Sequence, residues 1–165
     1  MKTLVLGGIR SGKSVYAERL IESLPAPYTY IATAQIWDPE MQARVDEHIK
    51  RRGPNWQTLE APLELPAVLS VCQGPVLVDC LSLWLTNYLV AERDPKAATE
   101  QLISQVAAFK HPIVLVSNEV GLGGISANKL QRRFADACGS LNQAIAQVCD
   151  QVTFIAAGLP LTLKG

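Results

Sequence analysis

Eight residues near the N-terminus, GGIRSGKS at positions 7–14, constrain the fold of this chain more than any other segment. Gly7 and Gly12 frame four residues and are followed by Lys13 and Ser14, which matches the phosphate-binding pattern G-x-x-x-x-G-K-[ST]. Only a glycine-rich turn lets the backbone pass close to a polyphosphate and point successive N–H groups at it. The segment therefore predicts a nucleoside triphosphate site on a loop that joins a strand to a helix.

The residues on either side of the loop agree with that setting. An apolar run over Thr3–Leu6 precedes it, and apolar residues at helical spacing follow it. We expect Lys13 to reach the β- and γ-phosphates, Ser14 to ligate Mg²⁺, and the helix N-terminus to favour the bound anion. The expected nucleotide contacts are Gly7, Gly8, Ile9, Arg10, Ser11, Gly12, Lys13 and Ser14. The alternative is a surface turn that contains a lysine by chance.

Apolar runs typical of strands alternate with helical patterns along the whole chain. The runs are 3–6, 28–32, 76–79, 113–117 and 152–156, with a short edge strand expected at 159–164. The helical patterns are 13–23, 39–52, 63–71, 81–91, 95–109 and 127–149, the last interrupted near Gly139. This alternation predicts an α/β, P-loop NTPase-type three-layer fold, a mainly parallel sheet with helices on both faces, in one domain over 1–165.

Charge and cysteine content narrow the class of protein. Lys plus Arg and Asp plus Glu number 15 each, so the net charge gives no reason to expect a nucleic-acid or membrane partner. No apolar segment is long enough for a membrane span, and the N-terminus enters a strand too early for a signal peptide, so we expect a cytoplasmic protein. The four cysteines, Cys72, Cys80, Cys138 and Cys149, lie apart in apolar segments and are expected to be buried thiols.

The run Val76–Asp79 ends an apolar strand on a carboxylate. In a phosphate-binding fold such an aspartate lies at the carboxyl edge of the sheet, close to the metal that accompanies the nucleotide. We therefore interpret Asp79 as a second Mg²⁺ ligand. The alternative is that Asp79 caps the helix that follows, since aspartate is a common N-cap residue.

The helical pattern over 39–52 carries a histidine among cations. His48 lies on the same predicted face as Arg44 and Arg52, each four residues away. Nearby positive charge favours the neutral imidazole, which is its nucleophilic form. One interpretation is that His48 attacks phosphorus and forms a phosphoramidate, with the arginines holding the phosphates. The alternative is an ordinary surface histidine.

Polar residues follow the fourth apolar strand as they follow the third. Ser117–Gly121 reads SNEVG, and its polar groups are expected at the carboxyl edge of the sheet, where ligands bind in such folds. Spacing gives no distance to an acceptor group, so Glu119 and Asp79 both stay open as the base of a phosphoryl transfer.

The motifs together resemble one known family. GGIRSGKS, IATAQIWDPEMQARVDEHIKRR, VLVDCLSLWLTNYL, VSNEVGLGGIS and RRFADACGSLNQ occur in the same order as in the bifunctional adenosylcobinamide kinases and adenosylcobinamide-phosphate guanylyltransferases of cobalamin biosynthesis. The resemblance spans nearly the whole chain. The P-loop is shared with many NTPases, whereas the EM-x-x-R-[IV]-x-x-H and SNEVG segments are far more discriminating.

The resemblance implies a two-step enzyme that uses GTP and ATP with Mg²⁺. The aminopropanol hydroxyl of adenosylcobinamide is phosphorylated, and GMP is then transferred from GTP to adenosylcobinamide phosphate with release of pyrophosphate. His48 matches the histidine that the family guanylylates. Family nucleotide contacts match the P-loop, Ala32, Thr33, Ala34, Ile49, Lys50, Arg51, Arg52, Glu60 and Asp79. Relatives form ring-like trimers, so the resemblance implies a homo-oligomer.

Two other functions fit the residues without the resemblance. One is another small-metabolite P-loop kinase, in which His48 has no catalytic part. The other is a regulator that binds nucleotide without turnover, since a fold does not by itself define a function.

Overall fold

A computed structural model describes residues 1–36, 39, 42 and 52–165 of the chain. Within these residues a seven-stranded sheet has the order β3-β2-β4-β5-β1-β6-β7. Its strands are β1 (Lys2–Gly7), β2 (Tyr28–Ala32), β3 (Trp56–Glu60), β4 (Val76–Asp79), β5 (Ile113–Asn118), β6 (Gln151–Ala156) and β7 (Leu159–Lys164). All neighbouring strands pair in parallel except β6 and β7, which form an antiparallel edge.

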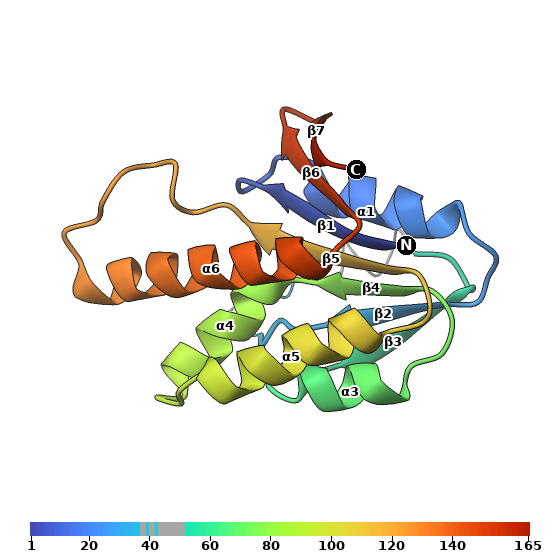
Figure 1. Cartoon of the computed structure of the whole chain (residues 1–165), viewed down its shortest axis with the longest axis horizontal. Coiled ribbons are helices and arrows are strands. Elements are labelled where there is room, and N and C mark those ends of the chain that lie inside the picture. Colours follow the sequence, from blue (N-terminus) through green and yellow to red (C-terminus); the bar gives the residue numbers. More distant parts are fainter. Residues whose placement is uncertain (37–38, 40–41, 43–51) are drawn as a thin grey trace.

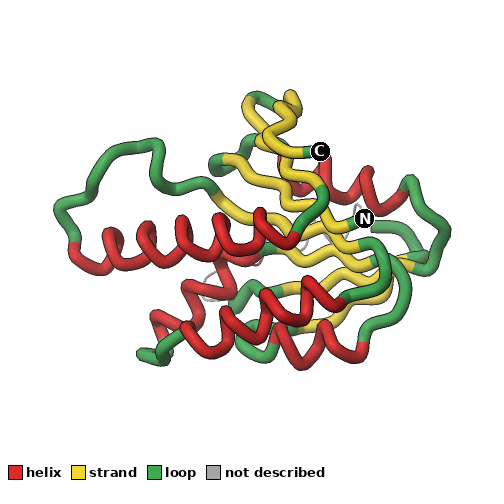
Figure 2. The backbone as a smooth tube through the Cα atoms, in the orientation of Figure 1, coloured by secondary structure: helices red, strands yellow, loops and turns green. Residues whose placement is uncertain are grey.

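Helices lie on both faces of the sheet. The described helices are α1 (Lys13–Glu22), α3 (Leu65–Val71), α4 (Leu81–Val90), α5 (Lys96–Ala108) and α6 (Lys129–Val148). Helix α1 packs against β1, β4 and β5 on one face, whereas α3, α4, α5 and α6 form a layer on the other (Figures 1 and 2). The predicted mainly parallel sheet between two helical layers is confirmed.

Two apolar cores explain why the strands have nearly continuous apolar sequences. The core under α3 to α6 includes fully buried Trp84, Leu65 and Leu115, and the core under α1 includes Val5 and Val116. Since alternate residues of a strand point to opposite faces, a strand buried on both faces must be apolar at every position. The five predicted strands and the predicted edge strand are therefore confirmed to within a residue or two at their ends.

Strand β3 was not predicted. Its sequence, WQTLE, is mostly exposed because it pairs only with β2, at the edge of the sheet. An edge strand buries less of its surface, so it lacks the continuous apolar pattern of the central strands.

The predicted interruption of the last helix near Gly139 is wrong. Helix α6 runs without a break through Lys129–Val148. Its first turn is capped by the Asn128 side chain, whose Oδ1 accepts from the N–H groups of Leu130 at 2.8 Å and Gln131 at 3.2 Å. Packing of buried Leu141 and Ile145 against the sheet outweighs the conformational freedom of one glycine. The predicted helix over 39–52 lies mostly outside the described residues.

We predict that Gly139→Ala stabilises the protein. A Cβ atom at this position meets no atom within 4 Å, and a helical glycine costs about 0.5–1 kcal/mol relative to alanine. Thermal or urea unfolding of the variant should show a gain of that size. A matched change, Gly12→Ala, should lower stability, because Gly12 has a φ of +95°. A loss of stability in Gly139→Ala would contradict the account of α6.

Two further expectations concern burial and membranes. All four cysteines are buried free thiols, as expected. Among the helices of the described residues, none is both long and apolar enough to cross a membrane.

Candidate functional site

The predicted phosphate-binding loop joins the carboxyl end of β1 to the first turn of α1. Arg10 and Gly12 have left-handed backbone conformations, with φ of 56° and 95°. Gly12 is the N-cap residue of α1 and provides no side-chain cap, so the first N–H groups of the helix remain available to an anion. The strand–loop–helix geometry expected of GGIRSGKS is thus present.

Close packing explains the first glycine of the loop. A Cβ atom on Gly7 would stand 2.5 Å from Ser11 Oγ and 2.6 Å from the Ile155 carbonyl oxygen. The loop is tied to the neighbouring hairpin, since the Gly158 N–H donates to the Ser11 carbonyl at 2.9 Å. Lys13 folds over the same loop, and its Nζ donates to the Gly8 carbonyl at 3.1 Å. The lysine is therefore already held at the loop that would carry the phosphates.

Asp79 ends β4, two strands from the loop in the sheet order. It does not cap the following helix, because the N-cap residue of α4 is Cys80 and no side chain caps that helix end. The alternative interpretation of Asp79 as a helix cap is thus not supported, and its carboxylate is not used for capping. Thr33 fixes the turn instead: its Oγ1 accepts from the Cys80 N–H at 2.8 Å and donates to the Cys80 carbonyl at 2.7 Å.

The pKa of the buried Cys80 thiol is shifted by its surroundings. The pKa of Cys80 is raised to about 11, first by burial and then by the Asp79 carboxylate, while hydrogen bonds from Ser82 and Leu83 and the Lys13 charge oppose the rise. Strands β4 and β1 both pair in parallel with β5, so Asp79 and the P-loop lie at the same carboxyl edge of the sheet, with β5 between them.

A row of predicted nucleotide contacts extends from Asp79 to the edge of the sheet. Ala32 pairs with Asp79 on one side and with Glu60 on the other, so the three residues share a register row. Glu60 is exposed and lies four strand spacings from β1, or roughly 19 Å at 4.8 Å per spacing. Glu60 therefore lies far from the P-loop along the same edge. Ala34 is half-buried.

Thr33 lies inside the protein. Its side chain is fully buried, its hydroxyl binds Cys80, its N–H donates to the Asp79 carbonyl at 3.3 Å, and its carbonyl accepts from Asn87 Nδ2 at 2.8 Å. In this conformation Thr33 holds the turn after Asp79 and presents no polar group to a nucleotide.

Arg52 connects the predicted basic segment to the sheet. Its guanidinium carbon lies 3.4 Å from the centroid of the Tyr30 ring on β2, which is the geometry of a cation–π contact. Burial raises the pKa of Tyr30 well above its usual value, Asp79 raises it further, and Arg52 opposes them. Arg52 therefore lies against β2, the strand that pairs with the strand ending in Asp79. Among the described residues, the Nη1 atom of Arg52 is buried without a hydrogen-bond partner.

The remaining predicted residues of the basic segment cannot be placed. His48, Ile49, Lys50 and Arg51 lie outside the described residues.

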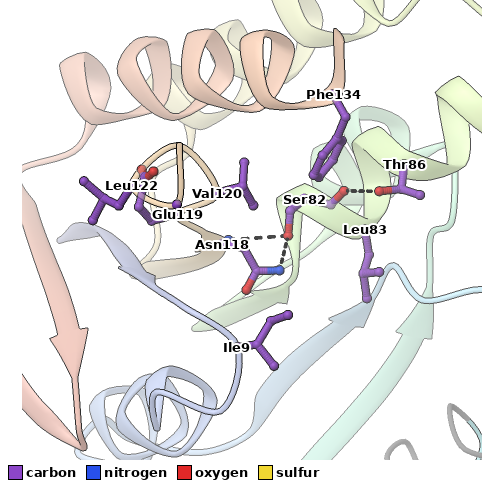
Figure 3. Close-up of a pocket in the computed structure, with 10 residues that line it drawn as sticks. Ile9, Ser82, Leu83, Thr86, Asn118, Glu119, Val120, Leu122 and Phe134 are labelled. Atoms are coloured by element: carbon purple, nitrogen blue, oxygen red, sulfur yellow. Dashed lines mark hydrogen bonds between the residues drawn. The ribbon is translucent and has the colours of Figure 1, made fainter. Parts of the chain in front are cut away.

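A cleft of about 480 Å³ opens beside the P-loop. It lies between Ile9 of that loop, the first turns of α4, the segment after β5, and Phe134 of α6 (Figure 3). Its polar lining consists of Ser82, Thr86, Asn118 and Glu119, and Asn118 Nδ2 donates to Ser82 Oγ at 2.8 Å. The sequence predicted that the SNEVG segment lies at a ligand-binding edge but did not single out Asn118. No local pattern predicted that Ser82 and Phe134 would line the same cleft as Asn118. Only the order of the strands brings these segments together.

Comparison with known proteins identifies relatives over the full chain. A family model described as "Cobinamide kinase / cobinamide phosphate guanyltransferase" matches residues 3–163. The bifunctional adenosylcobalamin biosynthesis protein CobP of Pseudomonas aeruginosa is 48% identical over 100% of this chain and 98% of that protein. The bifunctional adenosylcobalamin biosynthesis protein CobU of Salmonella typhimurium is 38% identical over 99% of this chain and 100% of that protein.

Solved structures support the fold at low sequence identity. An ATPase from the type III secretion system of pathogenic bacteria is 11% identical, with a TM-score of 0.56 over 98% of this chain and 56% of that one. The RadB recombinase is 13% identical, with a TM-score of 0.53 over 93% of this chain and 73% of that one. Together with the P-loop geometry, these likenesses identify the three-layer α/β fold of P-loop NTPases.

Proposed function

The chain belongs to the cobinamide kinase / cobinamide phosphate guanyltransferase family, and we propose that it carries both activities in one P-loop domain over residues 1–165. In the first reaction adenosylcobinamide is phosphorylated by ATP or GTP. In the second, GMP passes from GTP to adenosylcobinamide phosphate, and pyrophosphate is released. The observation that carries the proposal is the full-length family match on a chain whose P-loop, with Lys13 held on it, lies at the same sheet edge as Asp79.

The kinase step uses the loop end of the sheet. Backbone N–H groups of the loop and the N-terminus of α1 bind the phosphates, and Lys13 moves from the Gly8 carbonyl to the β- and γ-phosphates. Ser14 and Asp79 supply a hydroxyl and a carboxylate, which are the hard oxygen ligands that suit Mg²⁺ alongside phosphate oxygens and water. When bound, Mg²⁺ neutralises charge on the transferred phosphoryl group.

The guanylyl step needs a nucleophile and groups that bind GTP. His48 is proposed as the nucleophile that takes GMP from GTP, so that a difficult transfer between two anions is divided into two steps. Arg52 supports this role because it is held on Tyr30 and has a buried donor without a partner. The exposed Glu60 carboxylate can accept hydrogen bonds from the N1–H and N2–H₂ groups of guanine, at the far end of a GTP whose phosphates lie on the P-loop.

The two reactions can be separated by the position of the label. With wild-type protein, adenosylcobinamide and Mg²⁺, label in the γ-phosphate should appear in adenosylcobinamide phosphate. Label in the α-phosphate of GTP should appear on the protein and in the final guanylylated product, but not in adenosylcobinamide phosphate. Transfer of γ-label to some other alcohol, with none to adenosylcobinamide, would favour another metabolite kinase. Binding of nucleotide without any turnover would favour a regulator.

We further propose that the chain forms a homo-oligomer in the cytoplasm, a trimer by its resemblance to relatives. Strand β7 leaves an exposed edge, and its three leucines, Leu159, Leu161 and Leu163, alternate along it with 71%, 59% and 56% of their surface exposed. Alternate residues of a strand share a face, so Leu159 and Leu161 form an apolar strip on this edge strand, and a register irregularity opposite Val152 and Thr153 falls at Leu163. A second copy of the chain is the occupant that we propose.

Leu161→Glu should therefore dissociate the assembly. A charge in the apolar strip would be buried on association, at a cost that an exposed monomer avoids. Light scattering after size-exclusion chromatography should give a multiple of 17.9 kDa for wild type and 17.9 kDa for the variant. The matched change Thr162→Glu introduces the same charge at the adjacent, oppositely directed position and should keep the assembly. A monomeric wild-type protein would refute the proposal.

A further inference from the structure

Asn118 ends the strand that separates the two parts of the proposed kinase site. Strand β5 lies between β1, which carries the P-loop, and β4, which carries Asp79. Asn118 pairs in register with Gly7, and the next N–H, of Glu119, donates to the Gly7 carbonyl at 3.1 Å. Asn118 therefore lies at the edge where the terminal phosphate and its acceptor would meet.

The amide of Asn118 is turned in a defined direction. Its Nδ2 donates to Ser82 Oγ at 2.8 Å, and its backbone N–H approaches the same oxygen at 3.4 Å. The Oδ1 atom therefore points away from Ser82, and it is buried without a hydrogen-bond partner. Native structures rarely leave a buried polar atom unpaired, and such atoms call for a functional explanation. An amide oxygen can only accept, so the missing partner must be a donor such as a hydroxyl group.

The cleft beside Asn118 is suited to bind a flexible, largely apolar side arm of a larger ligand. Ile9 and Phe134 face each other across it, and Leu83, Val120 and Leu122 complete its walls (Figure 3). Its volume of about 480 Å³ is typical of pockets that hold drug-sized ligands. A corrin ring with its amide side chains is larger than that, so one arm of such a molecule enters while the ring stays outside.

We propose that this cleft seats the aminopropanol arm of the kinase acceptor and that the acceptor hydroxyl donates its hydrogen bond to Asn118 Oδ1. The inference rests on the proposed function and assigns the acceptor side of that site. Because Oδ1 is buried, the neighbouring side chains that line the cleft rotate when the arm binds, as is common on ligand binding, and the hydroxyl then reaches the oxygen while the Ser82 hydrogen bond is kept. The apolar walls contact the methyl and methylene groups of the arm. Ser82 holds the Asn118 amide in place, and that amide orients the hydroxyl of the acceptor.

The step that this geometry serves is a balanced phosphoryl transfer. The acceptor oxygen forms a bond to the γ-phosphorus, the bond from that phosphorus to the β–γ bridging oxygen breaks, and the nucleoside diphosphate leaves. The hydroxyl proton passes to an oxygen of the transferred phosphoryl group and then to water. Since phosphoryl transfer depends mainly on positioning and charge neutralisation, a neutral amide that aims the nucleophile is sufficient. Asn118 is thus an acceptor-binding residue and Ser82 is a positioning residue.

The test compares the two half-reactions in Asn118→Ala and Ser82→Ala. In Asn118→Ala, kcat/KM for adenosylcobinamide in the kinase reaction should fall about 100-fold, since a misplaced nucleophile costs that much. Ser82→Ala should cause a smaller loss. In both variants the affinity for a non-hydrolysable GTP analogue and the labelling of the protein by α-labelled GTP should equal those of wild type. Phe134→Ala should raise KM for adenosylcobinamide and leave kcat unchanged.

A matched control separates this role from a structural one. Asn142 donates from Nδ2 to the Asn118 carbonyl at 3.1 Å but does not line the cleft. Asn142→Ala should lower the unfolding temperature and keep the KM for adenosylcobinamide. If Asn118→Ala showed the wild-type kcat/KM for adenosylcobinamide, the inference about the acceptor would be overturned, while the proposed function would stand. A parallel loss of GTP-analogue affinity would overturn the inference too, by assigning Asn118 to the phosphates. If wild type does not phosphorylate adenosylcobinamide, the proposed function itself fails.

Discussion

Replacement of Lys13 by alanine is expected to lower the rate of adenosylcobinamide phosphorylation by about 100- to 1,000-fold, the usual effect of removing one donor aimed at transition-state charge. Lys13 Nζ already lies on the P-loop, 3.1 Å from the Gly8 carbonyl oxygen. No other described side chain on the loop can replace it as a cation held against the loop backbone. The rate of transfer of γ-label to adenosylcobinamide measures the effect.

The control for Lys13 is a lysine of the same type away from the site. Lys110 is exposed in the segment before β5, and Lys110→Ala should keep the wild-type rate. Unfolding curves for both variants should match wild type closely, because Lys13 makes one hydrogen bond to a loop that faces the ligand. A Lys13→Ala variant that is folded and phosphorylates adenosylcobinamide at the wild-type rate would remove the P-loop from the mechanism.

Replacement of His48 by alanine is expected to abolish guanylyl transfer while phosphorylation continues. Loss of a covalent nucleophile lowers a rate by far more than loss of a positioning contact, on the order of 10⁴-fold or greater. With α-labelled GTP, wild type should acquire a label on protein that is lost in acid and kept in base, as a phosphoramidate requires. His48→Ala should acquire none. Its kinase rate with γ-labelled nucleotide should remain.

His111 provides the matched control, since it is the second of the two histidines in the chain. Its Nε2 contacts Gln73 Oε1 at 3.1 Å, and its ring packs edge-on against Phe109, at the opposite end of β5 from Asn118. His111→Ala should therefore acquire the label as wild type does. If labelling persisted in His48→Ala and disappeared in His111→Ala, the nucleophile would be His111, and the proposed role of His48 would be wrong.

The fold could be predicted from the sequence wherever burial is complete. Strands β1, β4 and β5 are buried on both faces, and their continuous apolar sequences leave no other interpretation. Strand β3 escaped prediction because an edge strand has one partner and much exposed surface. The predicted break at Gly139 was wrong because the unfavourable helix propensity of one glycine, less than about 1 kcal/mol, is smaller than the stabilisation from packing the helix face on the sheet.

The candidate site could be predicted only in part, for a reason of topology. The P-loop has a local signature, and Asp79 follows from an apolar strand that ends on a carboxylate. The order of strands has no local signature, so nothing in the sequence placed β5 between those two strands or Asn118 beside Gly7. The same order separates Glu60 from the loop, which is why we propose it for the guanine end of GTP, and it places Thr33 under the Asp79 turn.

The central claim is that this chain passes on both a phosphoryl group and a nucleotide, the second through a covalent protein intermediate. The most direct measurement isolates protein labelled with α-labelled GTP, removes free nucleotide, and adds unlabelled adenosylcobinamide phosphate. We predict that the label leaves the protein and appears in adenosylcobinamide-GDP in equal amount. Label that stays on the protein, or intact protein with Mg²⁺ that never acquires label, would contradict it.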